Sequence, residues 1–305
     1  MYFATLRPKQ GELKAIEEIQ KQFDVESNFT PNFIISEDYI NELAKIQKKY
    51  SKHFLIDLRN FEEQEDIDGF IQYRLSNTDL LELSSVVFPL WYNFEMVDNT
   101  DFVRITPDDI DLDFISWLPS GSNLLPGNIL IDFGYISGLP TSATLVAINQ
   151  VIGLLPNKNI IISSGSVPSP IPVSIDTDYM QLRFEKNLFD YLSSVSNHIL
   201  IYGDYCTVHP NQLSVNGAVI IPNVQIKYTS PSEYFFARNG RRTGHFSIVP
   251  VCDTLSSLPD FSSSFSWGDS IISEISSSKS NKGNAMTWAA IGINHHIAQC
   301  LLENS

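Results

Sequence analysis

The sequence predicts an α/β protein that folds as a single (β/α)8 barrel of the TIM-barrel type. Short, continuous aliphatic runs recur along the chain, and each ends at a polar residue, as in ILIDFG (residues 129–134) and ILIYGD (residues 199–204). Runs without apolar–polar alternation are typical of strands covered on both faces, as in a parallel sheet. Helical patterns separate these runs at a repeat of about 30 residues, which favours a barrel. A doubly wound open parallel sheet is the alternative.

Eight or nine strands are expected. The recurring pattern is clearest in FLIDLR, ILIDFG, IIISSG and ILIYGD. In chain order, the strand candidates are residues 2–6, 32–36, 54–59, 86–91, 102–106, 129–134, 160–165, 199–204 and 224–228.

Helices are expected between the strands. Two apolar stripes have helical spacing: Leu13, Ile16, Ile19 and Phe23 in one, and Tyr39, Leu43, Ile46 and Tyr50 in the other. Further helices are expected at residues 144–155, 181–193 and 286–302. No stretch has the composition of a linker, so residues 1–305 are predicted to form one domain. The serine-rich stretches 256–265 and 276–280 are interpreted as surface loops.

The composition limits the class of partner and the compartment. The chain has a formal net charge of −15, which argues against nucleic-acid binding through a general basic surface and against binding to anionic lipid. Prolines interrupt the long, nearly uncharged stretch 133–175, so no membrane span is expected. Three isolated cysteines without zinc-site spacing indicate reduced thiols and a cytoplasmic protein.

The barrel prediction locates a candidate site, because the chemistry of such barrels lies at the carboxyl ends of the strands. The polar residues expected there are Arg7, Lys9, Asp57, Arg59, Arg104, Thr106, Asp132, Ser163, Ser164, Asp204, Lys227 and Tyr228. Asp57, Asp132 and Asp204 could bind a divalent cation or act as acid and base. The alternative is that they form ion pairs with Arg7, Arg59, Arg104 or Lys227.

Residues near the C-terminus add two candidates. Adjacent residues on a helix point about 100° apart, so His295 and His296 are not expected to share one metal ion. One is interpreted as a core or capping histidine, and the other as a group that reaches the pocket. Asp269 follows Trp267-Gly268. It is either the N-cap of a helix or strand at 270–275 or part of the site.

Three further charged segments can be interpreted from the sequence. The run Asp109–Asp113 begins like a calcium loop but has Phe114 where glycine is required, so it is predicted to start a helix instead. Residues 62–68 are interpreted as a solvated loop. Arg238, Arg241 and Arg242 form a basic loop or hairpin where a phosphate or an acidic partner could bind.

Several segments resemble the beta family, which is named for a phage beta protein and occurs in bacteria and phages. They are IYGDYCTVHP (201–210), IKYTSPSEYFFARNG (226–240), FSWGDSIISE (265–274) and GNAMTWAAIGINHHI (283–297). Upstream, MYFATLRPKQGELKAI, LIDFG and SSGSVP are also similar to the family. The chain departs from the family pattern at Lys227 and at Asn239-Gly240. The resemblance implies importance for Lys9, Glu12, Asp57, Arg104, Asp132, Asp204, His209, Tyr228, Arg238, Trp267, Asp269, Asn284, Trp288, Asn294 and His295. It also implies a link to phages, mobile elements and anti-phage defence.

Together these observations give three hypotheses. The leading one is a cytoplasmic component of a prokaryotic phage-interaction or anti-phage defence system. It would bind a polar or phosphate-bearing ligand, or a partner protein, at the barrel mouth. The second is a metal-assisted hydrolase or phosphodiesterase acting on a nucleotide or nucleic acid. The third is a non-catalytic scaffold or sensor that docks a partner. The candidate catalytic residues are Asp57, Asp132, Asp204, Asp269 and His295; the candidate ligand-binding residues are Lys9, Glu12, Arg104, Tyr228, Arg238, Trp267 and Asn294.

Overall fold

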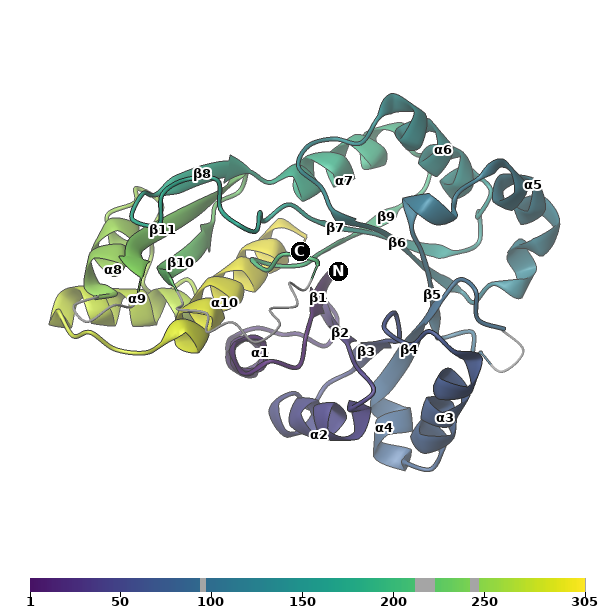
Figure 1. Ribbon diagram of the computed structural model, residues 1–305, viewed down its shortest axis with the longest axis horizontal. Helices are drawn as coiled ribbons and strands as arrows, with labels where there is room; N and C mark the ends of the chain where they lie inside the picture. Colours follow the sequence, from purple (N-terminus) through teal and green to yellow (C-terminus); the bar gives the residue numbers. More distant parts are fainter. Residues whose placement is uncertain (94–96, 212–222, 242–246, 305) are drawn as a thin grey trace. The chain divides into compact units, whose positions relative to one another are not determined.

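The structure is a computed structural model that describes residues 1–93, 97–211, 223–241 and 247–304, with only the backbone of Arg241 (Figure 1). The chain divides into two compact units. Unit 1 comprises Met1–Pro8, Glu26–Ser166 and Phe184–Tyr205, and unit 2 comprises Lys9–Val25, Val167–Arg183 and Cys206–Ser305. That the whole chain folds as one domain stays a prediction from the sequence.

Unit 1 contains a closed barrel of parallel strands in the order β1-β2-β3-β4-β5-β6-β7-β9, and it closes because β9 pairs with both β7 and β1 (Figure 1). The strands are β1 (Tyr2–Leu6), β2 (Phe29–Ile34), β3 (Phe54–Asp57), β4 (Ser84–Pro89), β5 (Phe102–Ile105), β6 (Asn128–Tyr135), β7 (Asn159–Gly165) and β9 (Leu200–Asp204). The predicted (β/α)8 barrel is therefore confirmed, and the open-sheet alternative is excluded.

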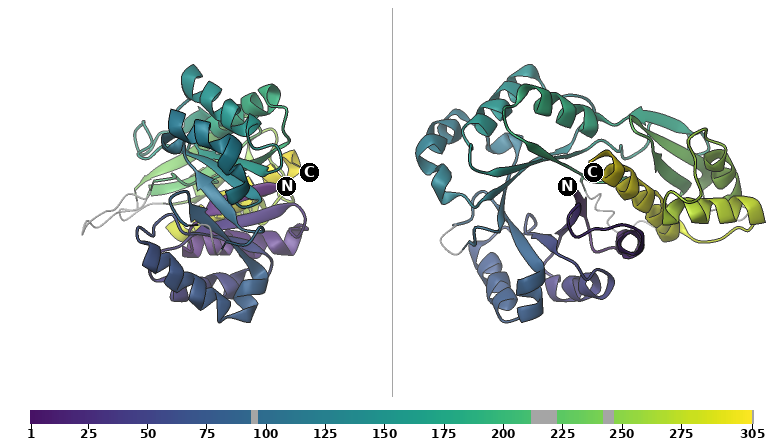
Figure 2. Two further views of the ribbon diagram at one scale, coloured as in Figure 1. Left: turned by 90° about the vertical axis from the view of Figure 1, so that its right-hand side faces the viewer. Right: turned by 180° about the vertical axis from the view of Figure 1, so that it is seen from behind.

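Six α-helices of unit 1 lie around the outside of these strands (Figures 1 and 2). They are α2 (Tyr39–Lys49), α3 (Gln64–Leu75), α4 (Thr78–Leu83), α5 (Leu112–Gly121), α6 (Ser142–Gly153) and α7 (Phe184–Val195), with short 3-10 turns η2 (Pro107–Asp109) and η3 (Ser122–Leu124). On this outer face Ile131 and Ile162 of the strands pack with Ile148 of α6 and Leu188 of α7 in one apolar cluster. The continuous aliphatic runs follow from this arrangement, since each strand is covered on both faces.

Unit 2 contains an antiparallel sheet of order β10-β11-β8. Its elements are β8 (Tyr179–Leu182), β10 (Asn223–Thr229), β11 (Glu233–Arg241), α1 (Gln10–Gln22), α8 (Val249–Ser256), α9 (Trp267–Ser278) and α10 (Ala285–Glu303). The helix α10 packs against β10, α1 and α9, and its residues are buried from Ala290 to Leu301. Gly292 allows this contact, because a Cβ at that position would lie 2.5 Å from the carbonyl oxygen of Lys227.

Several boundaries differ from the sequence-based expectation. The segment 224–228 is a strand, but it belongs to the antiparallel sheet as β10. The helix expected from residue 181 begins at Phe184, because residues 179–182 pair with β11 as β8. Residues 64–68, interpreted as a loop, form the first turn of α3.

The second serine-rich stretch also needs correction, since Ser277 and Ser278 lie in the last turn of α9. Their hydroxyls donate to carbonyls one turn earlier, on Ser273 and Glu274, at 2.5 and 2.7 Å. Serine side chains that bond to the helix backbone in this way are tolerated in a helical turn. The predicted helix start at the aspartate run is correct, because Asp111 caps α5 by accepting a hydrogen bond from Phe114 N at 2.7 Å.

Among the described residues, no helix combines the length and apolarity that a membrane crossing requires.

Candidate functional site at the barrel mouth

The interior of the barrel is layered. Phe3, Leu55, Val87, Phe102, Leu130 and Ile161 form one apolar cluster, each from a different strand. Successive side chains on a strand point to opposite faces, so the residue two positions further along each strand also points inward. That rule gives a second layer, nearer the carboxyl ends of the strands, that is largely polar. From β1, β3, β5, β6 and β7 it contains Thr5, Asp57, Arg104, Asp132 and Ser163, and the strand register adds Asn32 opposite Thr5 and Leu55.

Arg59 joins two aspartates of this polar layer. Its Nε and Nη2 donate to the two carboxylate oxygens of Asp57 at 2.9 and 2.5 Å. Its Nη1 lies 2.9 Å from Oδ2 of Asp132. Asp132 also contacts Arg104, which precedes it by 28 residues in the sequence. Arg104 Nε donates to the same Asp132 oxygen at 2.8 Å. The four charged groups thus form one connected network of two carboxylates and two guanidinium groups.

Tyr205 and Asn32 extend the network on either side. The hydroxyl of Tyr205, the residue after β9, donates to Asp132 Oδ2 at 2.6 Å and also contacts Nη1 of Arg59. The amide of Asn32 donates to Asp57 Oδ2 at 3.0 Å. Both aspartates are fully buried, so these hydrogen bonds compensate the cost of taking their charge out of water.

The local sequence builds the turns that hold the two aspartates. Asp57 Oδ1 accepts a hydrogen bond from Arg59 N at 3.1 Å, and Asp132 Oδ1 accepts one from Gly134 N at 2.9 Å. An aspartate that bonds to the backbone two residues on stabilises a bend at the end of a strand. The bend in DFG requires glycine, because Gly134 has a φ of 60°.

Electrostatics favour the charged forms of Asp132 and Arg59. Burial by itself raises the pKa of Asp132, but the guanidinium groups of Arg59 and Arg104 outweigh it and lower the pKa to about 2. Burial lowers the pKa of Arg59, yet the neighbouring Asp57 and Asp132 carboxylates raise it well above the ordinary value. Burial and the Asp132 carboxylate raise the pKa of the Tyr205 hydroxyl, which keeps that proton in place as a donor. At neutral pH Asp132 and Arg59 are therefore held as opposite charges, with the Tyr205 hydroxyl as a donor beside them.

Asp204 does not join this network. Strand register pairs it with Ser164 and Ala4, one position out of phase with the inward-facing residues of β7 and β1. Its side chain therefore points to the outer face of the sheet. There it accepts hydrogen bonds from the hydroxyls of Tyr2 and Tyr202 at 2.6 and 2.8 Å. The sequence-based grouping of Asp204 with Asp57 and Asp132 missed this one-residue change of phase.

Asp269 and His295 form a different cluster, inside unit 2. Asp269 Oδ2 lies 2.8 Å from His295 Nδ1, and His295 Nε2 lies 2.7 Å from the carbonyl oxygen of Thr229. Tyr228 donates to Asp269 Oδ1 at 2.9 Å and its ring stacks on His295 with centroids 3.7 Å apart. Both ring nitrogens of His295 lie within hydrogen-bond distance of an oxygen acceptor. The cluster is a buried set of hydrogen bonds and ring contacts that joins α9, α10 and β10.

Asp269 is also not an N-cap. Ser266 caps α9, because its hydroxyl accepts from Asp269 N at 3.2 Å and donates to Asp269 Oδ2 at 2.6 Å. His296 is the core histidine of the pair: its Nδ1 lies 2.9 Å from Thr229 Oγ1 and its Nε2 lies 3.3 Å from the sulfur of Cys300.

Four other candidates also lie in unit 2. Asn294 is buried and bridges α9 to α1, accepting from Gly268 N at 3.0 Å and donating to Ala15 O at 3.1 Å. Glu12 is buried on α1, whereas Lys9 is exposed at the N-cap of that helix. Trp267 is half-buried, and the ammonium of Lys14 lies 5.6 Å from its ring centre.

Arg238 is tied to a loop of unit 2. Its Nη1 donates to the carbonyls of Val173 and Ser174 at 3.3 and 2.7 Å, and burial lowers its pKa. These contacts use Nη1, whereas Nε is buried without a hydrogen-bond partner among the described residues. In the proposed basic loop, the side chain of Arg241 and all of Arg242 lie outside the described residues.

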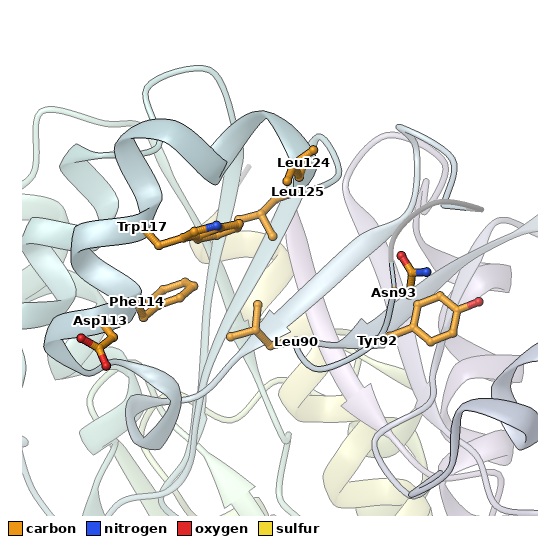
Figure 3. A pocket seen from close by; sticks show the side chains of 8 residues that line it. All are labelled: Leu90, Tyr92, Asn93, Asp113, Phe114, Trp117, Leu124 and Leu125. Carbon is orange, nitrogen blue, oxygen red and sulfur yellow. The ribbon is translucent and has the colours of Figure 1, made fainter.

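A separate apolar groove lies on unit 1. Its volume is about 660 Å3 and it lies between the segment after β4 and helix α5. Phe114 and Trp117 of α5 point toward the side on which Leu90 lies, and their two rings stack 5.9 Å apart (Figure 3). Leu90, Tyr92, Asn93, Asp113, Phe114, Trp117, Leu124 and Leu125 line the groove. The sequence reasoning missed it, because its residues come from three segments without a shared motif.

The mouth also contains residues that the sequence did not select. Asn32 and Tyr205 lie at the mouth with the predicted Asp57, Asp132 and Ser163. The residues two positions before them are Thr30 and Gly203, so no inward-facing apolar residue marks either one in the sequence. Arg59 was expected at the mouth and as an ion-pair partner, and the structure makes it the group that links both aspartates.

Comparison with models of known protein families identifies the family of this chain. A family model described as Beta protein matches residues 118–301, which is more than half of the chain. The chain belongs to the Beta protein family. No curated protein matches it. In this Beta family protein, the match covers β6, β7, β9 and most of unit 2, while Asp57, Arg59 and Arg104 precede it in the sequence.

Proposed function

We propose that this Beta family protein binds a small polar ligand at its barrel mouth, in the cytoplasm, as part of a prokaryotic phage-interaction or anti-phage defence system. The observation that carries the binding proposal is the buried network of Asp57, Arg59, Arg104 and Asp132. A barrel can fill this layer with apolar side chains, so a charged layer directly above an apolar one needs a reason other than packing. Pre-organised charge in a partly dry site is what recognition of a polar ligand requires.

The phage and defence context has a different support. It comes from the resemblance to the beta family, whose members occur in phages, mobile elements and defence neighbourhoods. The family match is consistent with that context. Three buried free cysteines, Cys206, Cys252 and Cys300, agree with a reducing compartment.

The position of Arg59 favours ligand binding over metal-assisted hydrolysis. A divalent cation shared by Asp57 and Asp132 would have to lie between their carboxylates, and that position is taken by the guanidinium, which contacts both. Binding a cation there would require displacing a buried charge that contacts three carboxylate oxygens and the Tyr205 hydroxyl. The hydrolase hypothesis therefore makes a clear contrary prediction: Mg2+ or Mn2+ should raise the melting temperature, and Asp57→Asn should abolish that rise.

Two assays test the proposal. A thermal-shift screen with small polar molecules, with and without divalent ions, should find a ligand that raises the melting temperature of the wild type and not of Arg104→Gln. Plating efficiency of phages on cells that express the protein should differ from cells with an empty vector, and Arg104→Gln should remove the difference. Lys158→Gln is the matched control, because it removes the same charge just before β7, at the opposite end of the barrel.

Two outcomes count against the proposal. A complete absence of stabilising molecules would contradict the binding part, provided that the folded state is intact by circular dichroism. Unchanged phage plating in a host with the protein expressed would contradict the defence part.

A further inference from the structure

Three polar groups at the barrel mouth have bonding capacity left over. Arg104 uses only Nε, which donates to Asp132; among the described residues, nothing accepts a hydrogen bond from its Nη1 or Nη2. Within the same part of the chain, Asn32 Oδ1 and Ser163 Oγ are buried and lack a hydrogen-bond partner. Asn32 is 2% exposed and Ser163 is 1% exposed. Buried polar atoms without partners are uncommon in folded proteins, and each calls for an explanation.

These groups come from three separate strands of the barrel and face its interior. In the ring of strands Asn32 belongs to β2, Arg104 to β5 and Ser163 to β7, so no two are on neighbouring strands. All three side chains lie in the inward-facing polar layer. The interior of an eight-stranded barrel is only wide enough for side chains or one small ligand. A single small molecule held in the mouth is the simplest common partner for the three groups.

Each free group specifies one feature of that molecule. The unused Nη1–Nη2 edge of Arg104 is a planar pair of donors, which matches the two oxygens of a carboxylate or phosphate. The free oxygen of Asn32 is an amide carbonyl, which can only accept, so it requires a hydroxyl or amine on the ligand. Ser163 can donate or accept.

The charge of the site selects between the two anions. Asp57 and Asp132 carry two negative charges, and Arg59 and Arg104 carry two positive ones, so the network has no net charge. A carboxylate adds one negative charge, and an amino group on the same ligand cancels it. A phosphate monoester adds close to two at neutral pH. In a buried network whose formal charges already balance, the ligand with the smaller added charge is favoured.

We propose that the ligand of the barrel mouth is a small hydroxy acid or amino acid, whose carboxylate binds Arg104 and whose hydroxyl or amine donates to Asn32. This inference rests on the proposed ligand-binding function and adds the chemical class of the ligand. It assigns Arg104 and Asn32 as specificity-determining residues, and leaves Arg59 as the positioning residue that holds the two aspartates.

The test uses the full chain and a panel of matched probes. The panel contains hydroxy acids and amino acids of two to six carbons, and for each the analogue without the hydroxyl or amine, the analogue without the carboxylate, and the corresponding phosphate monoester. Binding is measured by ligand-observed NMR and confirmed by calorimetry. We expect at least one hydroxy acid or amino acid to bind, and its analogue without the donor to bind about ten-fold more weakly.

Two variants attribute the binding to named groups. Arg104→Gln should weaken the carboxylate probe by about ten-fold or more, whereas Lys158→Gln should not. Asn32→Leu should weaken the hydroxyl-bearing probe but leave the analogue without the hydroxyl unchanged. Because that second probe still has to bind, it also shows that the Asn32 variant is folded.

The results separate this inference from the proposed function. A phosphate monoester that binds at least ten-fold more tightly than its matched carboxylate would overturn the inference. So would a neutral polar ligand whose affinity does not depend on Arg104. In both cases the mouth remains a ligand site. If no probe of any class binds, the inference and the binding proposal fail together.

Discussion

Replacing Arg59 with methionine should destabilise the protein strongly, and the loss should depend on pH. The side chain is only 12% exposed, and it contacts Asp57 and Asp132, which are both 0% exposed. Removing one partner of a buried ion pair typically costs about 3 to 5 kcal/mol, because a charge is left without compensation. Methionine retains most of the apolar volume, so little of this loss comes from a cavity. We expect a loss of about 3 to 5 kcal/mol at pH 7.

The pH dependence follows from the sign of the change. In the variant, burial is no longer outweighed by Arg59, so the pKa of Asp132 rises relative to the wild type. A carboxylate whose folded-state pKa exceeds its unfolded value destabilises the protein above that range and recovers stability as the pH falls. Each proton taken up relieves about 1.4 kcal/mol per pH unit. The deficit of Arg59→Met should therefore shrink as the pH falls from 7 to 5, by about 1.4 kcal/mol for each unit by which the pKa of Asp132 in the variant lies above 5.

Urea unfolding followed by tryptophan fluorescence and circular dichroism measures this deficit at both pH values. The double variant Asp57→Asn with Arg59→Met should be less destabilised than the sum of the two single variants, since it removes both members of one pair. The control is Lys14→Met, whose side chain is 44% exposed; it should change stability by less than about 1 kcal/mol. A deficit below about 1 kcal/mol at pH 7, or one that grows toward pH 5, would refute the reasoning.

Three further predictions concern stability. Because the arginine partners of Asp132 lower its pKa from 3.8 to about 2, its contribution is present above pH 4 and is lost between pH 4 and 2; Asp132→Asn should flatten that part of the urea-unfolding profile, by about 2 to 3 kcal/mol. Gly292→Ala places a Cβ 2.5 Å from the carbonyl oxygen of Lys227 and should cost about 1 to 3 kcal/mol in urea unfolding, and an unchanged midpoint would contradict the close helix–strand contact. Asn294→Ala leaves a backbone N–H of α9 and a carbonyl of α1 without a partner; it should cost about 2 kcal/mol or more, whereas Asn294→Asp, which keeps the acceptor, should restore part of that loss.

The barrel itself could be predicted from the sequence because its signal is local. A strand covered on both faces must be apolar along its whole length, and a run such as ILIDFG shows this without knowledge of its neighbours. All eight barrel strands lie within two or three residues of the expected positions. The antiparallel sheet of unit 2 was harder to predict. Its strands β8 and β11 are half-exposed and lie about 50 residues apart in the sequence, and neither segment contains a pattern that indicates its pairing partner.

The candidate site divides in the same way. Polar residues at strand ends identified Asp57, Arg104 and Asp132, since a buried parallel strand rarely ends in charge without a reason. Whether such a residue points into the barrel depends on its phase along the strand, and that is set by hydrogen-bond register with the neighbouring strands. For this reason Asp204, at the end of an equally convincing run, faces outward.

By itself, then, the sequence determined that this chain is a (β/α)8 barrel with acidic and basic groups at its strand ends and a resemblance to the beta family. Only the tertiary structure decided which of those groups meet. It placed Arg59 between two aspartates, gave Asp269 and His295 a cluster of their own, and left Asn32, Ser163 and Arg104 with free bonding capacity. The physical reason is the separation in sequence of the residues involved. The apolar pattern of a strand or helix is set by residues close together in the sequence, whereas the ion pairs and unpaired polar atoms depend on which distant strands the closed sheet brings together.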